Sequence, residues 1–127
     1  MDLSYLKEVN LSDNQLSSHH CKSIANLILH SQRLTVLNLR LNSITDSGGR
    51  FILAASTVSK SLESLSLSSN RLGAESFLIV VSMIDQELPL KRLDLSNNNF
   101  KNLVEFPQFK KVEDFEGFQI DLRNCWK

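Results

Sequence analysis

Four segments of the chain repeat one pattern of apolar and polar positions. They read LKEVNLSDNQL, LTVLNLRLNSI, LESLSLSSNRL and LKRLDLSNNNF, and they start at residues 6, 34, 62 and 90. In each segment an apolar residue occupies places one, four, six and eleven, and an asparagine occupies place nine. The spacing between starts is constant, which predicts a repeat protein whose units stack on one another.

The two halves of each unit have different periods. In VNLS, LNLR, LSLS and LDLS, apolar residues alternate with polar ones, as in a short strand with one buried face. The second half shows a spacing of three and four residues, which is typical of a helix with one buried stripe. This spacing is carried by Cys21, Ile24, Ala25 and Ile28, by Phe51, Ile52 and Ala55, and by Phe77, Val80, Val81 and Ile84. We expect these helices to begin near Ser18, near Thr45 or Asp46, and at Ala74 to Glu75.

A strand, a helix and another strand within 28 residues predict a right-handed crossover between parallel strands. Stacked units of this kind form an α/β solenoid, a horseshoe with a parallel concave sheet and outer helices. We therefore predict a single domain over residues 1–127 with about four to five repeats.

The recurring asparagine at place nine has a physical explanation. Where the chain turns off the strand, backbone N–H and C=O groups lose their partners in the sheet, and an orphaned buried group costs about 1–3 kcal/mol. A carboxamide offers two donors and an acceptor, so one side chain can satisfy groups in the coils above and below it. The predicted structural ladder consists of Asn14, Asn42, Asn70 and Asn98.

The pattern LxxLxLxxNxL with a 28-residue period resembles the ribonuclease-inhibitor class of leucine-rich repeats. Ile44-Thr45-Asp46-Ser47-Gly48, followed by Ile52 and Leu53, is similar to the strand-to-helix continuation of that class. The resemblance covers residues 6 to about 100 and implies a horseshoe that binds protein on its strand face or its loops. Members include inhibitor scaffolds, GTPase activators, innate-immune sensors and cytoskeletal or ciliary scaffolds, so the resemblance does not indicate a particular partner.

The C-terminal region, about residues 101–127, departs from the pattern. The segment from Phe100 onward holds five of the seven phenylalanines and the only tryptophan, which suits a cap over the last coil, with a docking patch as the alternative. Ile120 and Leu122 fit places four and six of a fifth strand, and Cys125 then occupies place nine, where the resemblance implies that cysteine is accepted.

The connection before that fifth strand is expected to be short or irregular, near Phe106 to Phe115. Pro107 argues against a full helix there because proline lacks the backbone N–H.

The first coil is expected to leave an open edge. Only five residues precede the first repeat, too few for the polar cap that the ends of solenoids usually need. The apolar residues on this edge are Leu6, Leu11, Leu16 and Ile24. Another protein, a second copy or an upstream part of a longer chain could cover it. One alternative is therefore a structural subunit, or a fragment of a larger solenoid or of a cytoskeletal or ciliary assembly, docked through this N-terminal coil.

The outward positions of the strands form the candidate binding surface. Places three, five and seven line up in columns because strands lie about 4.8 Å apart, and such a rigid grid lowers the ordering cost of association. Arginine and aromatic residues dominate interface hot spots, and Arg40 and Arg92 are the residues of this kind on the regular strands. Leu41, at place eight, is an apolar residue that needs either a partner or shielding by its own loop. The predicted protein-binding residues are Glu8, Asn10, Val36, Asn38, Arg40, Leu41, Arg92 and Asp94. A plain solvated surface is the alternative.

Charge and composition narrow the class of partner. Lys plus Arg and Asp plus Glu are both 14, so the net charge does not favour nucleic acid or an anionic membrane. The chain has no long apolar run or signal-like start. Cys21 and Cys125 lie far apart without a CxxC motif, which favours reduced thiols. We expect an intracellular, cytoplasmic protein, with the nucleus and the cilium left open.

Candidate catalytic residues are sparse. His19, His20 and Cys21 are adjacent in sequence and would not converge on a metal. The sequence contains no phosphate-binding loop, GxSxG elbow or HExxH motif, and helix capping accounts for Asp46. We expect no enzyme activity, cofactor or metal, and a role as an adaptor or scaffold for a protein partner. A GTPase activator is a further alternative, which would need acidic and arginine residues gathered on one rim.

Overall fold

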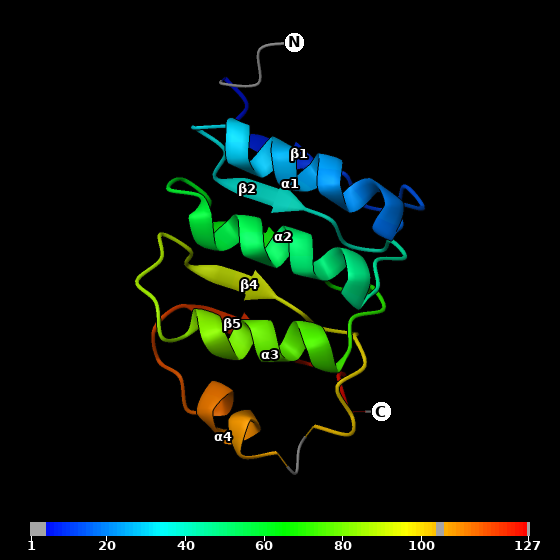
Figure 1. The fold of residues 1–127 in the computed structure, drawn as a ribbon, viewed down its shortest axis with the longest axis vertical. Helices are drawn as coiled ribbons and strands as arrows, with labels where there is room; N and C mark the ends of the chain where they lie inside the picture. Colours follow the sequence, from blue (N-terminus) through cyan, green and yellow to red (C-terminus); the bar gives the residue numbers. More distant parts are fainter. Residues whose placement is uncertain (1–4, 104–105, 127) are drawn as a thin grey trace.

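Each repeat of the chain contributes one strand to a common sheet and one helix to the outer side of that sheet (Figure 1). The computed structural model describes residues 5–103 and 106–126. The helices lie side by side on one face, and the strands lie behind them, so that the chain forms two layers (Figure 1). This is the predicted α/β solenoid with a parallel sheet.

Five short strands build the sheet in sequence order. They are β1 (Glu8–Asn10), β2 (Val36–Asn38), β3 (Ser64–Ser66), β4 (Arg92–Asp94) and β5 (Gln119–Asp121). Every neighbouring pair is parallel, and equivalent places of successive repeats face each other, as in the pairing of Leu37 with Leu65. The last pairing joins Leu93 to Ile120, so the fourth repeat is one residue shorter than the three before it. The predicted fifth strand is confirmed.

The helical segments of the first three repeats begin at the predicted positions, the first of them as a 3-10 turn, and a further helix in the fourth repeat was not predicted. They are the 3-10 helix η1 (Ser18–His20), α1 (Cys21–His30), α2 (Asp46–Val58), α3 (Ala74–Met83) and α4 (Pro107–Glu113). Thr45 is the N-cap of α2 and is extended, as a residue at that position should be.

The connection between β4 and β5 contains a helix, where a short or irregular connection was expected. Pro107 does not interrupt a helix there and is instead the first residue of the seven-residue helix α4. At a first helical position, the missing N–H of proline removes no hydrogen bond, and its fixed φ suits the helix.

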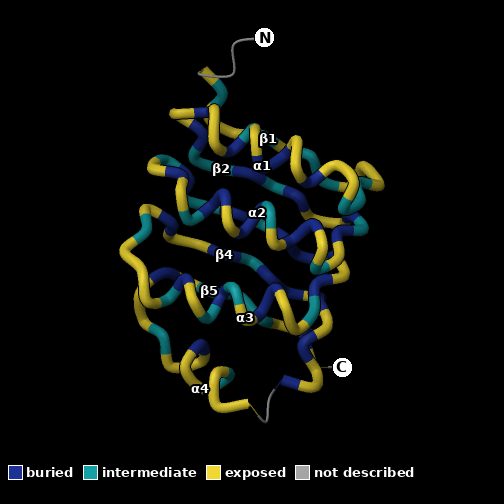
Figure 2. The backbone as a smooth tube through the Cα atoms, viewed as in Figure 1, coloured by how far each residue is buried: buried dark blue, intermediate teal, exposed yellow. Residues whose placement is uncertain are grey.

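The core cluster draws its buried residues from both the strands and the helices, and buried positions recur along both (Figure 2). Leucines at places four and six are fully buried in the second, third and fourth repeats, because those places point toward the helices. At the C-terminal end aromatic rings pack against one another in tilted and edge-on contacts. The Phe77 and Phe100 ring centroids lie 5.5 Å apart, and those of Phe109 and Trp126 lie 4.7 Å apart in an edge-on arrangement. Phe118 belongs to the core and Phe109 of α4 packs against it, whereas Phe106 and Trp126 are exposed.

Helix α2 fits tightly between its neighbours because of two glycines. A Cβ atom added to Gly48 would lie 2.6 Å from Cys21 Sγ and 2.8 Å from Ser18 Cα. One added to Gly49 would lie 2.7 Å from Leu72 Cδ2. A real Cβ atom does not make contacts this short, and at Gly48 one of the close neighbours is backbone, so the spacing between the first two helical segments depends on this glycine.

The N-terminal edge is only partly open. Leu6, Leu11 and Leu16 are half-buried, which agrees with the expected open edge. The expectation for Ile24 was wrong, because this residue is buried within the core cluster.

Among the described residues, no helix has both the length and the apolar character needed to cross a membrane.

Candidate functional site

The side chain of Asn70 joins its own repeat to the one before it. Its Nδ2 donates to the carbonyl oxygen of Leu67 at 3.1 Å and to that of Leu39, in the preceding repeat, at 3.0 Å. Its Oδ1 accepts the N–H of Ile44, also in the preceding repeat, at 3.0 Å. Asn70 is 8% exposed, so this carboxamide satisfies three backbone groups away from solvent.

Asn42 and Asn98 make the same contacts one repeat earlier and one repeat later. Both are buried. The partners are Leu11 O, Leu39 O, Asn14 N and Leu16 N for Asn42, and Leu67 O, Leu95 O and Leu72 N for Asn98. In the fifth repeat the thiol of Cys125 replaces the carboxamide, and its Sγ lies 3.1 Å from Leu95 O.

Asn14 differs from the other three and is exposed. Its Nδ2 donates to Ser12 O within its own turn at 3.0 Å. No earlier coil lies against it among the described residues, so its carboxamide has no preceding repeat to join. The expectation that Asn14 acts as a full rung of the ladder is therefore corrected.

The polar residues at place five of each strand have a local role that the sequence interpretation missed. Asn38 Oδ1 accepts the N–H of Arg40, two residues later, at 2.9 Å. The equivalent pairs are Asn10 with Ser12, Ser66 with Ser68, Asp94 with Ser96, and Asp121 with Arg123. Three predicted binding residues, Asn10, Asn38 and Asp94, thus stabilise the turn after the strand. The recurrence of Asn, Asp or Ser before a turn was the available signal.

The third, fourth and fifth repeats satisfy much of their own polarity on the concave face. Ser68 and Ser96 are buried, their hydroxyls lie 2.8 Å apart, and Ser96 Oγ donates to Asp94 Oδ1 at 2.7 Å. Arg123 Nη2 lies 2.7 Å from Asp121 Oδ2. The hydrogen bond from Arg123 outweighs the effect of partial burial and lowers the pKa of Asp121. These groups are already paired before any partner arrives.

Arg40 and Arg92 are exposed, and within the described residues neither guanidinium has an ion pair or a side-chain hydrogen bond. The structure does not bring them together. Arg92 begins β4, whereas Arg40 follows the end of β2, two strands away. At the strand starts, Glu8 is exposed and pairs in register with half-buried Val36. The predicted binding residues therefore divide into a group at the strand starts and a pair, Arg40 and Leu41, beyond β2.

Leu41 has an unusual backbone for its residue type. Its φ is 57°, in the left-handed region, and its side chain is 43% exposed. Place eight is left-handed in all five repeats, where the other residues are Asp13, Ser69, Asn97 and Asn124. Asparagine and aspartate tolerate this conformation, but it costs other L-residues about 1–2 kcal/mol. Leu41 does not recover that cost by burial. We call the exposed pair Arg40 and Leu41 the β2 rim.

Asp46 is engaged as a helix cap. Its Oδ1 accepts the N–H of Gly73 at 2.8 Å, the N–H of Ser76 at 3.1 Å and the hydroxyl of Ser76 at 2.6 Å. Partial burial would raise the pKa of Asp46, but these hydrogen bonds together outweigh it and lower the pKa. A carboxylate held in this way by the next repeat is poorly suited to act as a base.

Of the two adjacent histidines, His20 has a local role. His19 and His20 are exposed in η1, and His20 Nδ1 accepts the N–H of Ser17 at 3.0 Å. Over residues 5–103 and 106–126, no cluster of three or more His, Cys, Asp or Glu side chains could hold a metal ion.

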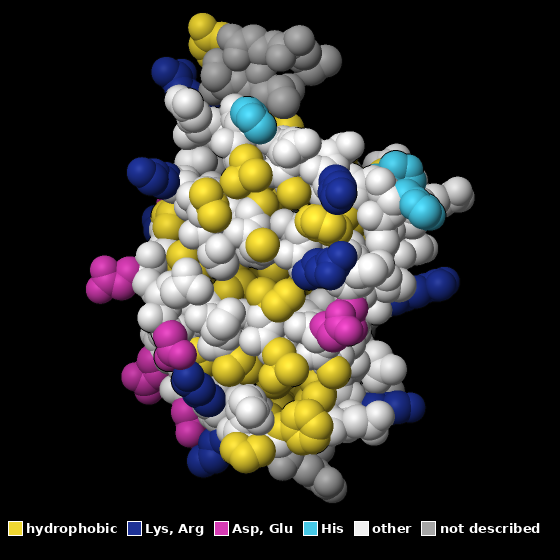
Figure 3. Space-filling model, viewed as in Figure 1, with side chains coloured by type: hydrophobic (Ala, Val, Ile, Leu, Met, Phe, Trp, Pro, Cys, Tyr) yellow, Lys and Arg dark blue, Asp and Glu magenta, His cyan; other side chains and the backbone are white. Residues whose placement is uncertain are grey.

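A second surface, which the sequence interpretation missed, lies on the outer side between α1 and α2. Hydrophobic side chains gather there with Lys and Arg side chains among them (Figure 3). We call it the α1–α2 groove, and its lining residues are Lys22, Ala25, Asn26, Leu29, Phe51, Ala54, Ala55 and Val58. The helical pattern predicted buried stripes but gave no indication that Leu29 and Val58 would be exposed.

Two sequence models of the Leucine Rich Repeat match the chain. One matches residues 30–53 and 58–76, and the other matches residues 5–27 and 89–111. Together they cover more than half of the chain, and they coincide with the repeats described above. The chain belongs to the leucine-rich repeat family. The narrower ribonuclease-inhibitor-like class remains a prediction from the 28-residue period.

Solved structures share the fold of this leucine-rich repeat chain. A tropomodulin C-terminal domain from Caenorhabditis elegans superimposes with a TM-score of 0.71 at 22% identity, over 95% of this chain and 75% of that one. The leiomodin-1 actin-binding site 2 gives a TM-score of 0.77 at 13% identity, over 94% and 72%. At these identities the likeness concerns the fold alone. No curated protein is significantly similar in sequence.

Proposed function

We propose that this leucine-rich repeat chain is a protein-interaction module, an adaptor or scaffold without catalysis or cofactor, that binds its partner at the β2 rim of the concave face. The observation that carries the proposal is the backbone of Leu41. A bulky residue is kept in a left-handed conformation with 43% of its surface exposed, at a place where other repeats use Asp, Asn or Ser. Strain of this kind without a local gain points to a role outside the fold.

The rim offers two complementary contacts. Leu41 supplies an apolar anchor, and the neighbouring Arg40 supplies a guanidinium that has no ion-pair partner within the described part of the chain. The rim is held firmly, because Leu41 N donates to Ser68 O at 3.0 Å and Arg40 N donates to Asn38 Oδ1. A preorganised anchor loses little entropy on binding, and arginine is common among hot spots. An apolar partner surface with a nearby carboxylate would fit this rim.

The test uses substitutions that sister repeats already contain. Arg40→Ser introduces serine, which the first, third and fourth repeats carry at place seven. Leu41→Asn introduces asparagine, which the fourth repeat carries at place eight as Asn97. Both variants should therefore fold. The wild-type and double-variant chains are immobilised, and proteins retained from cell extract are quantified by mass spectrometry. Proteins retained by the wild type should be lost from the double variant. Equal retention by both chains would refute a binding role for the rim. Lys110→Ser, on the exposed face of α4, is the control that should retain them.

Actin is the first partner that we propose to test, because the leiomodin-1 structure is described as an actin-binding site and shares this fold. The chain is mixed with actin filaments and sedimented, and separately titrated against monomeric actin. Binding of the wild-type chain to either form of actin, weakened in the double rim variant, would support actin as the partner. No interaction with either form would remove actin and leave the extract experiment to identify the partner.

Docking through the N-terminal edge is the second candidate, favoured by the half-buried Leu11 and Leu16 beside β1. Proteins that the immobilised rim double variant still retains from extract, but that a Leu11→Ser and Leu16→Ser chain does not retain, would support this candidate. Ile24 is unsuitable for such a test because it is buried and a charge there would unfold the chain. A GTPase assay without stimulation would remove the GTPase-activator alternative.

The proposal includes a cytoplasmic location and excludes nucleic acid and membranes as partners. Both cysteines are free and buried, which suits a reducing compartment. Equal numbers of basic and acidic residues support a protein partner over a polyanion.

A further inference from the structure

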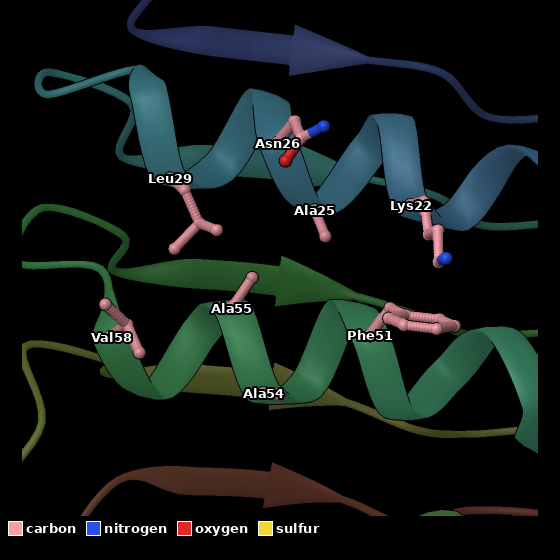
Figure 4. Close-up of a pocket in the computed structure, with 8 residues that line it drawn as sticks. All are labelled: Lys22, Ala25, Asn26, Leu29, Phe51, Ala54, Ala55 and Val58. Carbon is pink, nitrogen blue, oxygen red and sulfur yellow. The ribbon is translucent and has the colours of Figure 1, made fainter.

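The α1–α2 groove has a regular construction. Lys22, Ala25, Asn26 and Leu29 of α1 line it at a spacing of three and four residues, and Phe51, Ala54, Ala55 and Val58 of α2 line it at the same spacing (Figure 4). Alanines occupy the middle of both helices. Larger apolar side chains stand at the ends, and Leu29 and Val58 are 45% and 65% exposed. The result is a shallow apolar groove of about 390 Å³ with a floor of small residues.

The groove continues past the C-terminal ends of both helices. A second hollow of about 370 Å³ shares Leu29 and Val58 with the first and reaches Gln32 and Lys60. Helix α1 has ten residues, which corresponds to about 15 Å of length. An elongated open groove of this length suits a short helix better than a compact small molecule.

The charge of the groove is one-sided. Lys22 Nζ lies 5.5 Å and Arg50 Cζ lies 5.0 Å from the centre of the Phe51 ring, so two cations flank one aromatic side chain. Neither cation forms an ion pair within the described ranges. The N-terminal ends of α1 and α2 lie at this same end of the groove and add positive partial charge (Figure 4).

Acidic groups near the groove do not neutralise these cations. The lining of both hollows contains lysines and no acidic residue among the residues described. On α1 and α2 the acidic residue is Asp46, whose carboxylate caps α3, and Glu75 lies in the first turn of α3. The groove therefore combines an apolar floor with a cationic end.

We propose that the α1–α2 groove binds an amphipathic helix of a second protein, with an apolar stripe on the floor and acidic side chains against Lys22 and Arg50. The small side chains of Ala25, Ala54 and Ala55 allow a third helix to approach closely, as in ridge-into-groove packing. Leu29 and Val58 then lose their exposure to water. This surface lies on the opposite side of the sheet from the β2 rim, so one chain can hold two partners at once.

The test uses a designed peptide, because the natural partner is unidentified. The probe is a fluorescein-labelled helical peptide of roughly 15 residues, with leucine and alanine at helical spacing and glutamates beside the stripe at one end. Binding to the purified chain is followed by fluorescence anisotropy at two salt concentrations. We expect saturable binding that weakens by about tenfold in Val58→Lys. The control Leu78→Lys places the same charge at an exposed leucine of α3, and it should bind like the wild type.

Charge reversal makes the test specific. The double variant Lys22→Glu and Arg50→Glu should bind the glutamate peptide about fivefold more weakly than the wild type does. A second peptide, with lysines in place of the glutamates, should bind this double variant with the lost affinity restored. Absence of saturable binding, equal binding by Val58→Lys and Leu78→Lys, or failure of the lysine peptide to rescue would each overturn the proposal. Vesicles of phosphatidylcholine and phosphatidylserine provide the competing arm. Vesicle binding that depends on Val58 in the absence of peptide binding would assign the groove to a membrane and overturn the proposal as well.

Discussion

The side-chain amide of Asn70 lies 3.0 Å from the carbonyl oxygen of Leu39, a residue of the preceding repeat. The same side chain also binds a carbonyl of its own turn and the N–H of Ile44. Each of these backbone groups would cost about 1–3 kcal/mol if it were left buried without a partner. Neighbouring repeats are therefore joined by polar contacts at the end of the strands as well as by the apolar core.

Replacing Asn70 with leucine should destabilise the chain strongly. The side chain keeps about the same size, but the buried N–H of Ile44 loses its acceptor. The carbonyls of Leu39 and Leu67 each lose one of two donors and keep the one from Asn42 or Asn98. We therefore expect the free energy of unfolding to fall by about 2 kcal/mol or more. Urea denaturation followed by circular dichroism measures the change. Asn14→Leu is the matched control, because Asn14 is exposed and, within the described part of the chain, its side chain makes one local hydrogen bond. It should cost less than about 1 kcal/mol, and equal losses in the two variants would contradict this account of the ladder.

Removing the carboxylate of Asp46 should weaken the start of α3. Asp46→Ala deletes the acceptor for Gly73 and Ser76, and we expect a loss of about 1–2 kcal/mol in the free energy of unfolding. Asp85→Ala is the control, because its ion pair with Lys111 is exposed and should contribute less than about 1 kcal/mol.

Acid should remove the same contribution from the wild type. The pKa of Asp46 is lower in the folded chain than in the unfolded one, so the folded state favours the ionised form. The stabilisation by the Asp46 carboxylate is complete above the unfolded pKa, about pH 4, and is lost as the pH falls through the folded pKa. The stability difference between wild type and Asp46→Ala should therefore shrink below about pH 4. A difference that stays constant from pH 7 to pH 3 would show that the carboxylate is not the group responsible.

The fold could be predicted from the sequence because its determinants are local and periodic. Leu37 and Leu65 occupy the same place in successive repeats and pair in the sheet, so one alignment of the repeats gave the register of the strands. The fifth strand followed from the spacing of Ile120 and Leu122. Pro107 was harder to place, since a proline that ends one helix can begin another, and the sequence does not distinguish the two cases.

The candidate site was less predictable because it depends on backbone geometry and on exposure. The sequence placed Asn38 and Asp94 on the outward face, but it did not show that their side chains close the next turn. Asn14 has the same local sequence signal as Asn42, and it differs because no earlier coil lies against it among the described residues. The exposure of Val58 likewise depends on how far α1 and α2 stand apart, which no single helix encodes.

Adding a methyl group at Gly48 should destabilise the chain although alanine favours helices. The new Cβ would meet the backbone of Ser18 at 2.8 Å, so η1 and α2 would have to move apart. We expect Gly48→Ala to lose about 1–3 kcal/mol, which exceeds the helix-propensity gain of about 1 kcal/mol. Thermal unfolding measures the effect. Ser47→Ala, at the exposed neighbouring position of the same helix, should be close to neutral, and an unchanged melting temperature in Gly48→Ala would contradict the tight fit of α2.

The two thiols should be unreactive while the chain is folded. Burial raises the pKa of the Cys21 thiol to about 11, and burial also raises the pKa of Cys125. Since the thiolate is the reactive species, alkylation by iodoacetamide near neutral pH should be slow in buffer and fast in concentrated urea. Mass spectrometry of each cysteine checks this. Because the folded pKa is raised, the contribution of Cys21 to stability should decline as the pH rises above about 9. Rapid labelling of Cys21 in buffer would show that the α1 side of the core is open.

The conformation of Leu41 predicts opposite effects on stability and on binding. Leu41→Asn replaces a leucine with a residue that tolerates a φ of 57°, and Asn97 and Asn124 already adopt this conformation at place eight. The free energy of unfolding should rise by about 0.5–1 kcal/mol. A gain in stability of this size would show that leucine is not kept there for the fold.

The most direct test of the proposed binding role measures both properties on the same samples of wild-type and Leu41→Asn chains. Urea denaturation gives the stability, and quantitative mass spectrometry gives the proteins that each immobilised chain retains from cell extract. The account predicts that Leu41→Asn is at least as stable as the wild type and loses the partner that the wild type retains. An Asn variant that retains every protein in the same amount as the wild type would contradict the assignment of the β2 rim as the binding site.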